Sequence, residues 1–315
     1  MLDVRLLQTF REVAMRGSFS LAADELGFTQ PAVSQHLARL ERHLGVKLLE
    51  RTARGVNLTP AGEALLAETE AVLSSVRHAE RAAKAAGGVV ASRLRVGAFP
   101  SAAAGLVPGA VREARRRGGR AGFPEIELDL RVMEPEPALR ALARNRMDIA
   151  LMIDSPLDPI VVPEGVELVQ VTEDPMMIAL PPDHRMATRR SIDLAELADE
   201  PFLLTELGGT CADSNIMLHA CRNAGFAPNV RLESEDYNAL QGMAAAGLGV
   251  SIVPRLATIG SHPGVVLRPL KDPAPSRTIL AAVAKDRDAL VDTFVESLRA
   301  AGDELDGKSR LTAVA

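Results

Sequence analysis

A chain of 315 residues with a formal net charge of −5 is too long for one compact core, so we expect more than one domain. With 47% apolar and 24% charged residues, the composition excludes a largely disordered protein. No stretch reaches the roughly 18 consecutive apolar residues of a membrane helix. The two cysteines are too few for a disulfide framework, and the N-terminal residues lack a signal-peptide layout, so we expect a cytoplasmic protein.

The charge is unevenly distributed along the chain. Residues 1–60 contain eight Lys or Arg and six Asp or Glu, so they carry +2 although the whole chain carries −5. This segment is therefore the part best suited to bind a polyanion such as DNA.

The first sixty residues predict short helices broken at turn signals. Apolar residues recur at helical spacing over residues 3–16 and stop at Gly17. Ser18 or Ser20 is placed to cap a second helix that ends at Gly27. Thr29 is placed to cap a third, whose apolar stripe of Val33, Leu37, Leu40 and Leu44 ends at Gly45. Two helices joined by a short turn containing glycine are typical of a helix-turn-helix.

The opposite side of the third helix carries small, polar or cationic residues, namely Pro31, Ser34, Gln35, Ala38, Arg39 and Arg42. A glutamine can pair with the major-groove edge of adenine, and a serine can reach a base or a phosphate. Residues 46–59 predict a hairpin, or wing, on which Arg51 and Arg54 could meet phosphates. The alternative for both features is an ordinary solvated surface.

A long helix is predicted from Thr59-Pro60 to about Ala86. Its apolar and small residues repeat at heptad spacing: Leu65, Thr69, Val72, Val76, Ala79, Ala83 and Ala86. A heptad kept over so many turns favours pairing with the same helix of a second chain. The alternative is packing against the C-terminal domain of the same chain.

Strand and helix signals alternate after Ser92. Residues 94–99, 126–132 and 148–153 predict a parallel βαβ sheet, and a second set of strands and helices follows from residue 176. We expect two α/β lobes with a ligand cleft between them. The polar end from Gly302 to Ala315 predicts a flexible tail.

With these features established, the sequence SFSLAADELGFTQPAVSQHLARLERHLGVKLLERTARGVNLTPAGEALL resembles the N-terminal domain of the LysR-type transcriptional regulators. The YNALQGMAAAGLGVSIVP segment (237–254) is similar to that family's second-lobe helix and strand. The resemblance implies an all-α winged helix-turn-helix (1–59), a linker dimerisation helix (60–88) and an α/β effector domain (89–301). The last consists of two Rossmann-like lobes, as in periplasmic binding proteins, with lobe I at about 92–165 and 270–301 and lobe II at about 166–269.

The resemblance also implies partners and contact residues. The expected partners are double-stranded DNA with an interrupted palindrome, a small-molecule effector, a second copy in a dimer of dimers, and RNA polymerase. The expected DNA contacts are Ser18, Ser20, Thr29, Gln30, Pro31, Ser34, Gln35, Arg39, Arg42, Arg51 and Arg54. Many relatives have an arginine where this chain has Gln35, which leaves that contact open. The dimer helix would use Leu65, Val72, Val76, Ala79 and Ala83.

Carried over by position, the effector site comprises Ser101, Ala102, Met133, Glu134, Thr205, Glu206, Leu207 and Gly208. Ser101 begins a predicted helix, so its hydroxyl and the free N–H groups could hold an anion. Carboxylates at Glu134, Glu136 and Glu206 would repel a carboxylate ligand, and they favour a neutral or amine-bearing effector. No cofactor or metal site is expected.

Other classes of protein remain as alternatives. An enzyme is disfavoured because the sequence has no Walker loop, zinc spacing or G-x-S-x-G motif, and its six histidines are scattered. A solute-binding transport protein would require export. A redox switch could use Cys211 and Cys221, near where the peroxide-sensing regulators of the family keep their pair. A disulfide between them would require their shared predicted helix to unwind.

Overall fold

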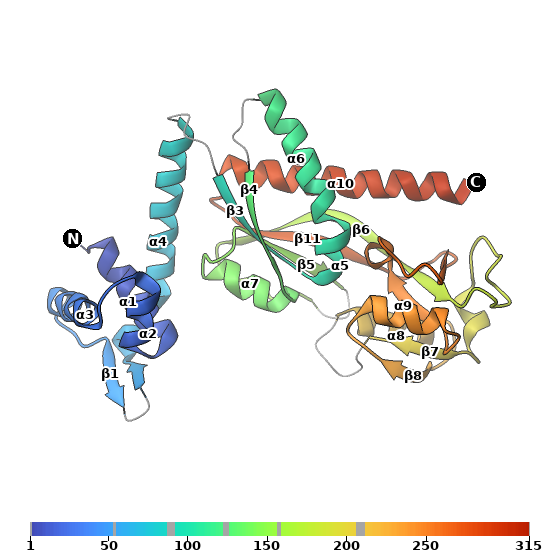
Figure 1. Ribbon diagram of the computed structural model, residues 1–315, viewed down its shortest axis with the longest axis horizontal. Coiled ribbons are helices and arrows are strands. Elements are labelled where there is room, and N and C mark those ends of the chain that lie inside the picture. Colours follow the sequence, from blue (N-terminus) through green and yellow to red (C-terminus); the bar gives the residue numbers. More distant parts are fainter. Residues whose placement is uncertain are drawn as a thin grey trace. The chain divides into compact units, whose positions relative to one another are not determined.

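The computed structural model describes residues 2–52, 55–86, 92–121, 126–155, 159–205 and 212–314. The chain divides into two compact units, Met1–Val90 and Ala91–Ala315. The first unit contains α1 (Val4–Arg16), α2 (Phe19–Leu26), α3 (Gln30–Leu44), β1 (Leu49–Thr52), β2 (Gly55–Leu58) and α4 (Pro60–Ala86) (Figure 1).

The three short helices end at the glycines expected from the sequence. Gly17, Gly27 and Gly45 have φ angles of 61°, 65° and 74°, and each backbone N–H bonds back to its helix. Glycine suits this left-handed conformation because it has no Cβ. One buried cluster then joins the helices and the hairpin: Leu6, Leu7, Phe10, Val13, Ala22, Ala23, Val33, Leu37, Leu40, Leu48 and Leu73.

The start of α4 is fixed against the residues before the hairpin. The Thr59 hydroxyl donates to the Lys47 carbonyl at 2.7 Å and accepts the Gly62 N–H at 3.0 Å, which caps the helix as the sequence predicts. A Cβ on Gly62 would lie 2.1 Å from the Leu48 carbonyl oxygen. Only glycine allows this approach between the helix and the residue before β1.

The second unit alternates strands and helices. Its first half contains β3 (Ser92–Ala98), α5 (Pro100–Gly105), α6 (Val107–Ala121), β4 (Ile126–Val132), α7 (Pro135–Ala143), β5 (Ile149–Asp154) and β6 (Val166–Leu180). Its second half contains η1 (Leu194–Leu197), β7 (Pro201–Leu204), α8 (Ala212–Asn223), β8 (Asn229–Glu233), α9 (Tyr237–Ala245), β9 (Ser251–Pro254), η2 (Arg255–Thr258), β10 (Val266–Pro269), β11 (Ser276–Ala284) and α10 (Ala289–Val314).

Strand β6 runs through both lobes of this unit. The strand order is β10-β6-β11-β5-β3-β4, and β9 also pairs with β6. β3 is parallel to β4 and β5, as expected, whereas β11 is antiparallel to β5 and β6. The pairing of β6 with β11 extends from Val166 to Pro175, and residues 176–180 pair with β9 or β10. By this pairing, β6 stays beside β11 to Pro175, which lies beyond the lobe boundary expected near residue 166.

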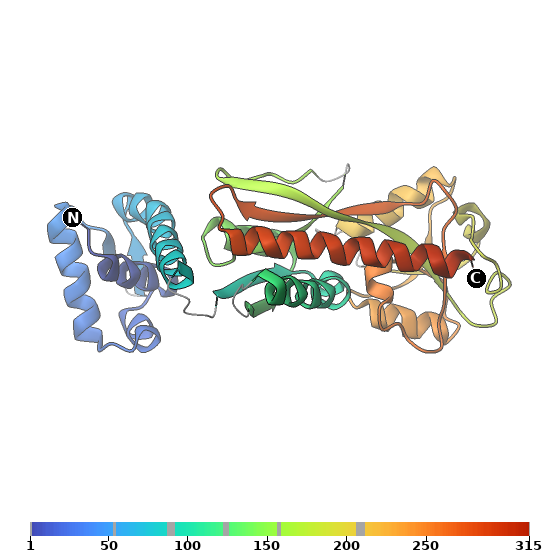
Figure 2. The same ribbon diagram turned by 90° about the horizontal axis from the view of Figure 1, so that it is seen from above.

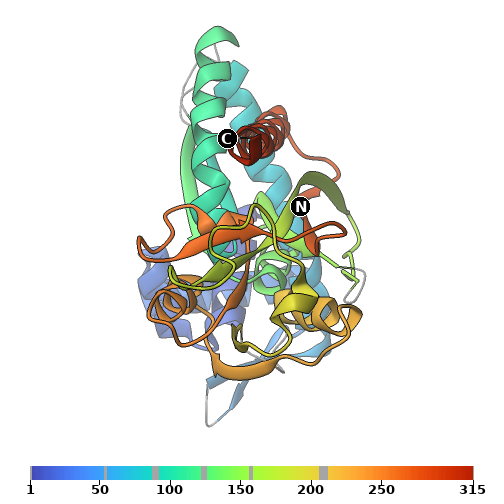
Figure 3. The ribbon, with the colours of Figure 1, turned by 90° about the vertical axis from the view of Figure 1, so that its right-hand side faces the viewer.

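Helices cover lobe I on both faces of its sheet. Ile149 and Leu151 of β5 belong to a core shared with α5, α6 and α10, whereas Ala150 and Met152 belong to a core shared with α7. This alternation follows from the two-residue repeat of a strand. Figure 2 shows α10 along β6 and β11, and Figure 3 shows α6 and α10 side by side.

The flexible tail expected from Gly302 is also wrong, because α10 continues to Val314. A Cβ on Gly302 would lie 2.6 Å from Cβ of Thr172 in β6. The glycine therefore allows the helix to pack closely on the strand instead of ending it. Composition alone does not distinguish these two uses of glycine.

Candidate nucleic-acid interface and effector site

The α3 helix buries one face and exposes the other. Val33, Leu37 and Leu40 are at most 3% exposed. The predicted DNA contacts Thr29, Gln30, Pro31, Gln35, Arg39 and Arg42 are exposed, and Ser34 is half-buried. Thr29 occupies the N-cap position, but its side chain makes no cap hydrogen bond, so the expected cap did not form. The apolar contacts hold the helix in place while the polar face stays open to a partner.

Two side chains that sequence reasoning missed hold α3 in position. His36 Nδ1 lies 2.9 Å from the hydroxyl of buried Thr9 in α1, and its ring meets Phe28 edge-on at 5.4 Å between centroids. Glu41 accepts hydrogen bonds from Lys47 at 2.7 Å and from the Leu48 N–H at 3.0 Å. Burial raises the pKa of Glu41, but these bonds outweigh it and lower that pKa overall.

The wing is a hairpin in which Thr52 pairs with Gly55. Its second strand is held to the turn after α1, because the Val56 N–H donates to the Gly17 carbonyl at 3.0 Å. Arg51 lies in β1 opposite Val56, whereas Arg54 lies outside the described residues. Ser18 caps α2 by accepting the Leu21 N–H at 3.4 Å, and Ser20 is exposed.

The predicted dimer seam of α4 divides into two parts. Leu65 packs against the core of its own unit, and Thr69 is 1% exposed, so the first part of the seam faces inward. Leu73, which lies outside the heptad pattern, belongs to the same core. Val72, Ala79 and Ala83 are exposed, and Val76 is half-buried. The exposed part of the predicted seam therefore begins near Val72.

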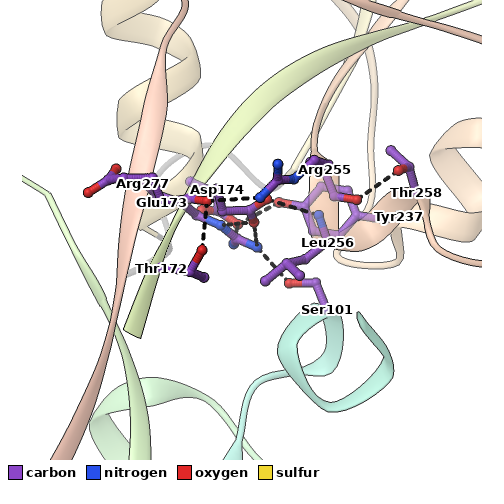
Figure 4. A network of polar contacts seen from close by, with 10 residues as sticks. Ser101, Thr172, Glu173, Asp174, Tyr237, Arg255, Leu256, Thr258 and Arg277 are labelled. Atoms are coloured by element: carbon purple, nitrogen blue, oxygen red, sulfur yellow. Dashed lines mark hydrogen bonds and ion pairs between the residues drawn. The ribbon is translucent and has the colours of Figure 1, made fainter. Parts of the chain in front are cut away.

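In the second unit, a buried guanidinium joins elements from both lobes. Arg277 of β11 donates to Asp174 of β6 from Nε at 3.0 Å and from Nη2 at 2.8 Å. The same guanidinium donates to Asp213 of α8 at 2.6 Å and to the Ser101 hydroxyl of α5 at 2.7 Å. In Figure 4, Ser101 approaches from α5, and Tyr237 and Arg255 lie on the opposite side of the cluster.

Electrostatic complementarity keeps Arg277 charged. Burial opposes the charge on Arg277, but Asp213 and Asp174 more than offset it and raise its pKa. Asp174 accepts the Leu256 N–H as well, and its pKa is raised by burial while Arg277 acts to lower it. Asp213 also accepts the Tyr237 hydroxyl at 2.6 Å. A fully buried cation is thus balanced by two carboxylates.

The predicted effector residues lie in different surroundings. Ser101 bonds to Arg277, and Thr205 lies 2.7 Å from the Ser214 hydroxyl, both within the buried polar region. Ala102 is fully buried in the lobe I core, and Met133 is half-buried. Glu206, Leu207 and Gly208 lie outside the described residues. Asp174, Asp213 and Arg277 were missed.

Two glutamates at the start of α7 differ in their electrostatic surroundings. Glu134 is exposed at the N-cap position of α7 and makes no side-chain cap bond. Burial raises its pKa, Asp213 and Glu235 raise it further, and Arg277 lowers it. Glu136, in contrast, pairs with Arg140 and is 70% exposed, so it does not belong to the buried cluster.

Comparison with protein-family models assigns both units of the chain to one family. The family model described as the bacterial regulatory helix-turn-helix protein, lysR family, matches residues 4–63, and that of the LysR substrate binding domain matches residues 87–303. This chain belongs to the LysR family of transcriptional regulators. The first match lies in the first unit, and the second match covers most of the second unit.

Individual LysR relatives agree with this assignment. The HTH-type transcriptional regulator AlsR of Bacillus subtilis is 31% identical over 260 residues, which are 81% of this chain and 82% of AlsR. The DNA-binding transcriptional dual regulator OxyR of Escherichia coli is 29% identical over 282 residues, 88% of either chain. Since such relatives are transcriptional regulators, the chain is a regulator and not an enzyme.

Solved structures show the same architecture. A full-length OxyR variant from Pseudomonas aeruginosa superposes with a TM-score of 0.73 at 25% identity, covering 95% of this chain and 98% of that one. The LysR family regulator CbnR gives a TM-score of 0.58 at 25% identity, covering 95% and 100%. Within the described ranges, no helix combines the length and apolar character needed to cross a membrane.

Cys221 is buried in the lobe II core of this LysR regulator. It lies on α8 among residues such as Phe202 and Met217, and it is 0% exposed. Burial raises the pKa of its thiol to about 12, so the reactive thiolate is disfavoured. Cys211 lies outside the described residues. The surroundings of Cys221 therefore match a packing residue better than a redox partner.

Proposed function

We propose that this LysR regulator reads operator DNA with α3 and the wing, and that a small molecule bound where the two lobes meet changes its binding to the operator. The observation that carries the first part is the open polar face of α3 opposite a fully buried apolar face. Such a face has hydrogen-bond donors and acceptors available for base edges and phosphates. Because the chromosome is its target, we also propose a cytoplasmic location.

Different residues have different roles in this proposal. Gln35 reads a base edge in the major groove, and Arg39 and Arg42 meet phosphates. Gln30 and Thr29 lie at the N-terminal end of α3, where recognition helices contact bases. Ser18, Ser20, Pro31, Ser34, Arg51 and Arg54 complete the proposed contact set.

Dimerisation places two α3 helices on one operator. We assign it to small and apolar residues in the outer half of α4, because the apolar core of their own unit does not include them. These residues are Val72, Val76, Ala79 and Ala83. Two half-sites about one helical turn apart, or a multiple of it, would then form an interrupted palindrome. A dimer of dimers would extend the contact, and RNA polymerase is the proposed downstream partner.

The effector acts where lobe I and lobe II share polar contacts. Arg277 joins α5 and β6 of lobe I to α8 of lobe II, so a ligand beside this cluster can favour one lobe arrangement over another. Ser101, Glu134 and Thr205 are the described residues that we assign to effector contact. Coupling between effector and operator binding is typically about 1–3 kcal/mol.

A footprint of the full-length protein on the DNA beside its own gene, repeated over a salt series, tests the DNA-binding role. We expect protection of a two-fold-symmetric site and a log-log salt dependence with a slope of several units. Protection that never exceeds that of scrambled DNA would contradict sequence-specific recognition.

Peroxide sensing is the second candidate, because relatives include proteins named hydrogen peroxide-inducible genes activators. The buried Cys221 with its raised thiol pKa does not support a disulfide with Cys211. Counting free thiols before and after mild peroxide treatment decides between the small-molecule effector and the redox switch. We expect Cys221 to stay reduced, and a Cys211–Cys221 disulfide in a peptide map would establish the redox alternative instead.

A further inference from the structure

The region between the lobes contains an excess of negative charge. Arg277 contacts both Asp174 and Asp213, so one cation faces two carboxylates. Glu134 lies near enough to Asp213 and Glu235 for both to raise its pKa, after the larger effect of burial. A second cation, Arg255, donates to the Glu173 carbonyl at 3.0 Å and acts on Asp174. Among the described residues, Asp213 and Glu235 therefore act on Glu134 as like charges, and Arg277 acts as the opposing charge.

Asp213 has one oxygen without a hydrogen-bond donor. Its Oδ2 accepts from Arg277 Nη1 and from the Tyr237 hydroxyl, both at 2.6 Å. Its Oδ1 is buried and has no partner among the described residues, and the whole side chain is only 4% exposed. A buried carboxylate oxygen without a donor is unfavourable, so this atom is suited to a donor supplied from outside the chain.

We propose that the effector of this regulator carries a protonated amine or a guanidinium group that binds between Asp213 and Glu134. The proposal rests on the proposed function, because it assumes that an effector binds where the lobes meet. An ammonium group has three N–H donors and no acceptor, so it can satisfy the buried Oδ1 of Asp213 and the exposed carboxylate of Glu134 together. A slight opening of the lobes would admit it, because Oδ1 is covered in this conformation.

Anionic and neutral ligands fit this arrangement less well. A carboxylate or phosphate would meet the buried Asp213 and the exposed Glu134 and Glu235, and these like charges would repel it, most strongly at the buried Asp213. A neutral hydroxyl could donate one hydrogen bond to Oδ1 but would leave the excess negative charge unbalanced. Hydrogen bonds between charged partners are roughly twice as strong as neutral ones.

Three four-carbon probes test the proposal on the full-length protein: 1,4-diaminobutane, butane-1,4-diol and succinate. Binding is followed by thermal unfolding and by calorimetric titration. We expect the diamine alone to raise the melting temperature. Glu134→Gln should weaken diamine affinity about tenfold or more, the scale of one charged hydrogen bond. Glu136→Gln is the matched control, since Glu136 is exposed and paired with Arg140, and it should bind like the wild type.

Asp213→Asn is the second variant, and its amide oxygen can still accept from Arg277 and Tyr237. We expect the same loss of diamine binding as in Glu134→Gln. If Asp213→Asn does not fold, the Glu134→Gln comparison still decides the result, because Glu134 is exposed and its side chain does not cap α7.

Failure of the amine assignment is distinguishable from failure of the proposed function. Stabilisation by succinate or the diol equal to that by the diamine, no response to the diamine, or unchanged affinity in Glu134→Gln would each overturn the amine assignment. Operator protection in the footprint would remain in all three cases. If the protein without ligand protects no operator but still binds the diamine, the DNA-binding role would be overturned and the cation site would be kept.

Discussion

The polar face of α3 and the Arg277 cluster use similar residue types in opposite ways. On α3, Gln35 and Arg39 are exposed, and the helix is held by the apolar residues behind them. In the cluster, Arg277 is 1% exposed and its donors bond to Asp174, Asp213 and Ser101. The difference teaches that burial decides the role: an exposed guanidinium is available to a partner, whereas a buried one maintains the fold.

The strongest test of this comparison is Arg277→Met. It leaves Asp174 and Asp213 buried without their cation, so we expect a loss of about 3–5 kcal/mol in the free energy of unfolding, measured by urea denaturation. Arg189→Ala is the control, because Arg189 forms an exposed pair with Glu196 and should cost at most about 1 kcal/mol. Similar small losses in both variants would contradict a structural role for Arg277.

Gly62→Ala tests how the hairpin is positioned in the first unit. The new Cβ would lie 2.1 Å from the Leu48 carbonyl oxygen, so the helix and the residue before β1 must separate. We expect a loss of about 1–3 kcal/mol in thermal or urea unfolding. Gly242→Ala, where the nearest atom would be 3.7 Å away, should be tolerated. Normal stability of Gly62→Ala would show that the close approach is not required.

Gln35→Ala tests whether the exposed face recognises sequence. We expect discrimination between operator and scrambled DNA to fall by about 1–3 kcal/mol in titrations, with the stability of the fold unchanged. Arg54→Ala should instead weaken both DNAs alike and reduce the salt slope by about 1. Equal losses on the two DNAs for Gln35→Ala would remove its assigned role.

The smallest expected effect is that of Glu41→Gln, which removes the charged bond between α3 and the residues before β1. We expect about 1 kcal/mol of lost stability at pH 7. Because the pKa of Glu41 is lowered in the folded state, its stabilisation is present above the unfolded pKa and is lost as pH falls through the folded one. The gap between wild type and variant, measured by urea unfolding, should therefore close below about pH 4. If the stability difference between wild type and variant does not change with pH, lost packing rather than lost charge is its cause.

Local signals made the first unit predictable. Helix periodicity and the glycines at 17, 27 and 45 are encoded within a few residues of the features they specify. The heptad of α4 was less informative, because at Leu65 its spacing serves a contact within the chain. A periodic pattern identifies an apolar face but not what covers it.

The Arg277 cluster could not be found in this way. Arg277 is 103 residues from Asp174, 64 from Asp213 and 176 from Ser101. Its only local signal is an arginine at the start of a predicted apolar strand, which is usually an exposed strand end. Gly302 was misread for a similar reason, since its partner Thr172 lies in a distant strand.

The path of β6 makes lobe II one continuous segment of the sequence. The chain leaves lobe I after Pro175 and returns at Ser276, and these two residues are partners in the β6–β11 pairing. Lobe II is thus one continuous insertion whose ends are neighbours in space. A single recombination that exchanges this insertion between relatives would replace every lobe II contact to an effector while preserving the sequence that reads DNA, so signal and operator can evolve separately.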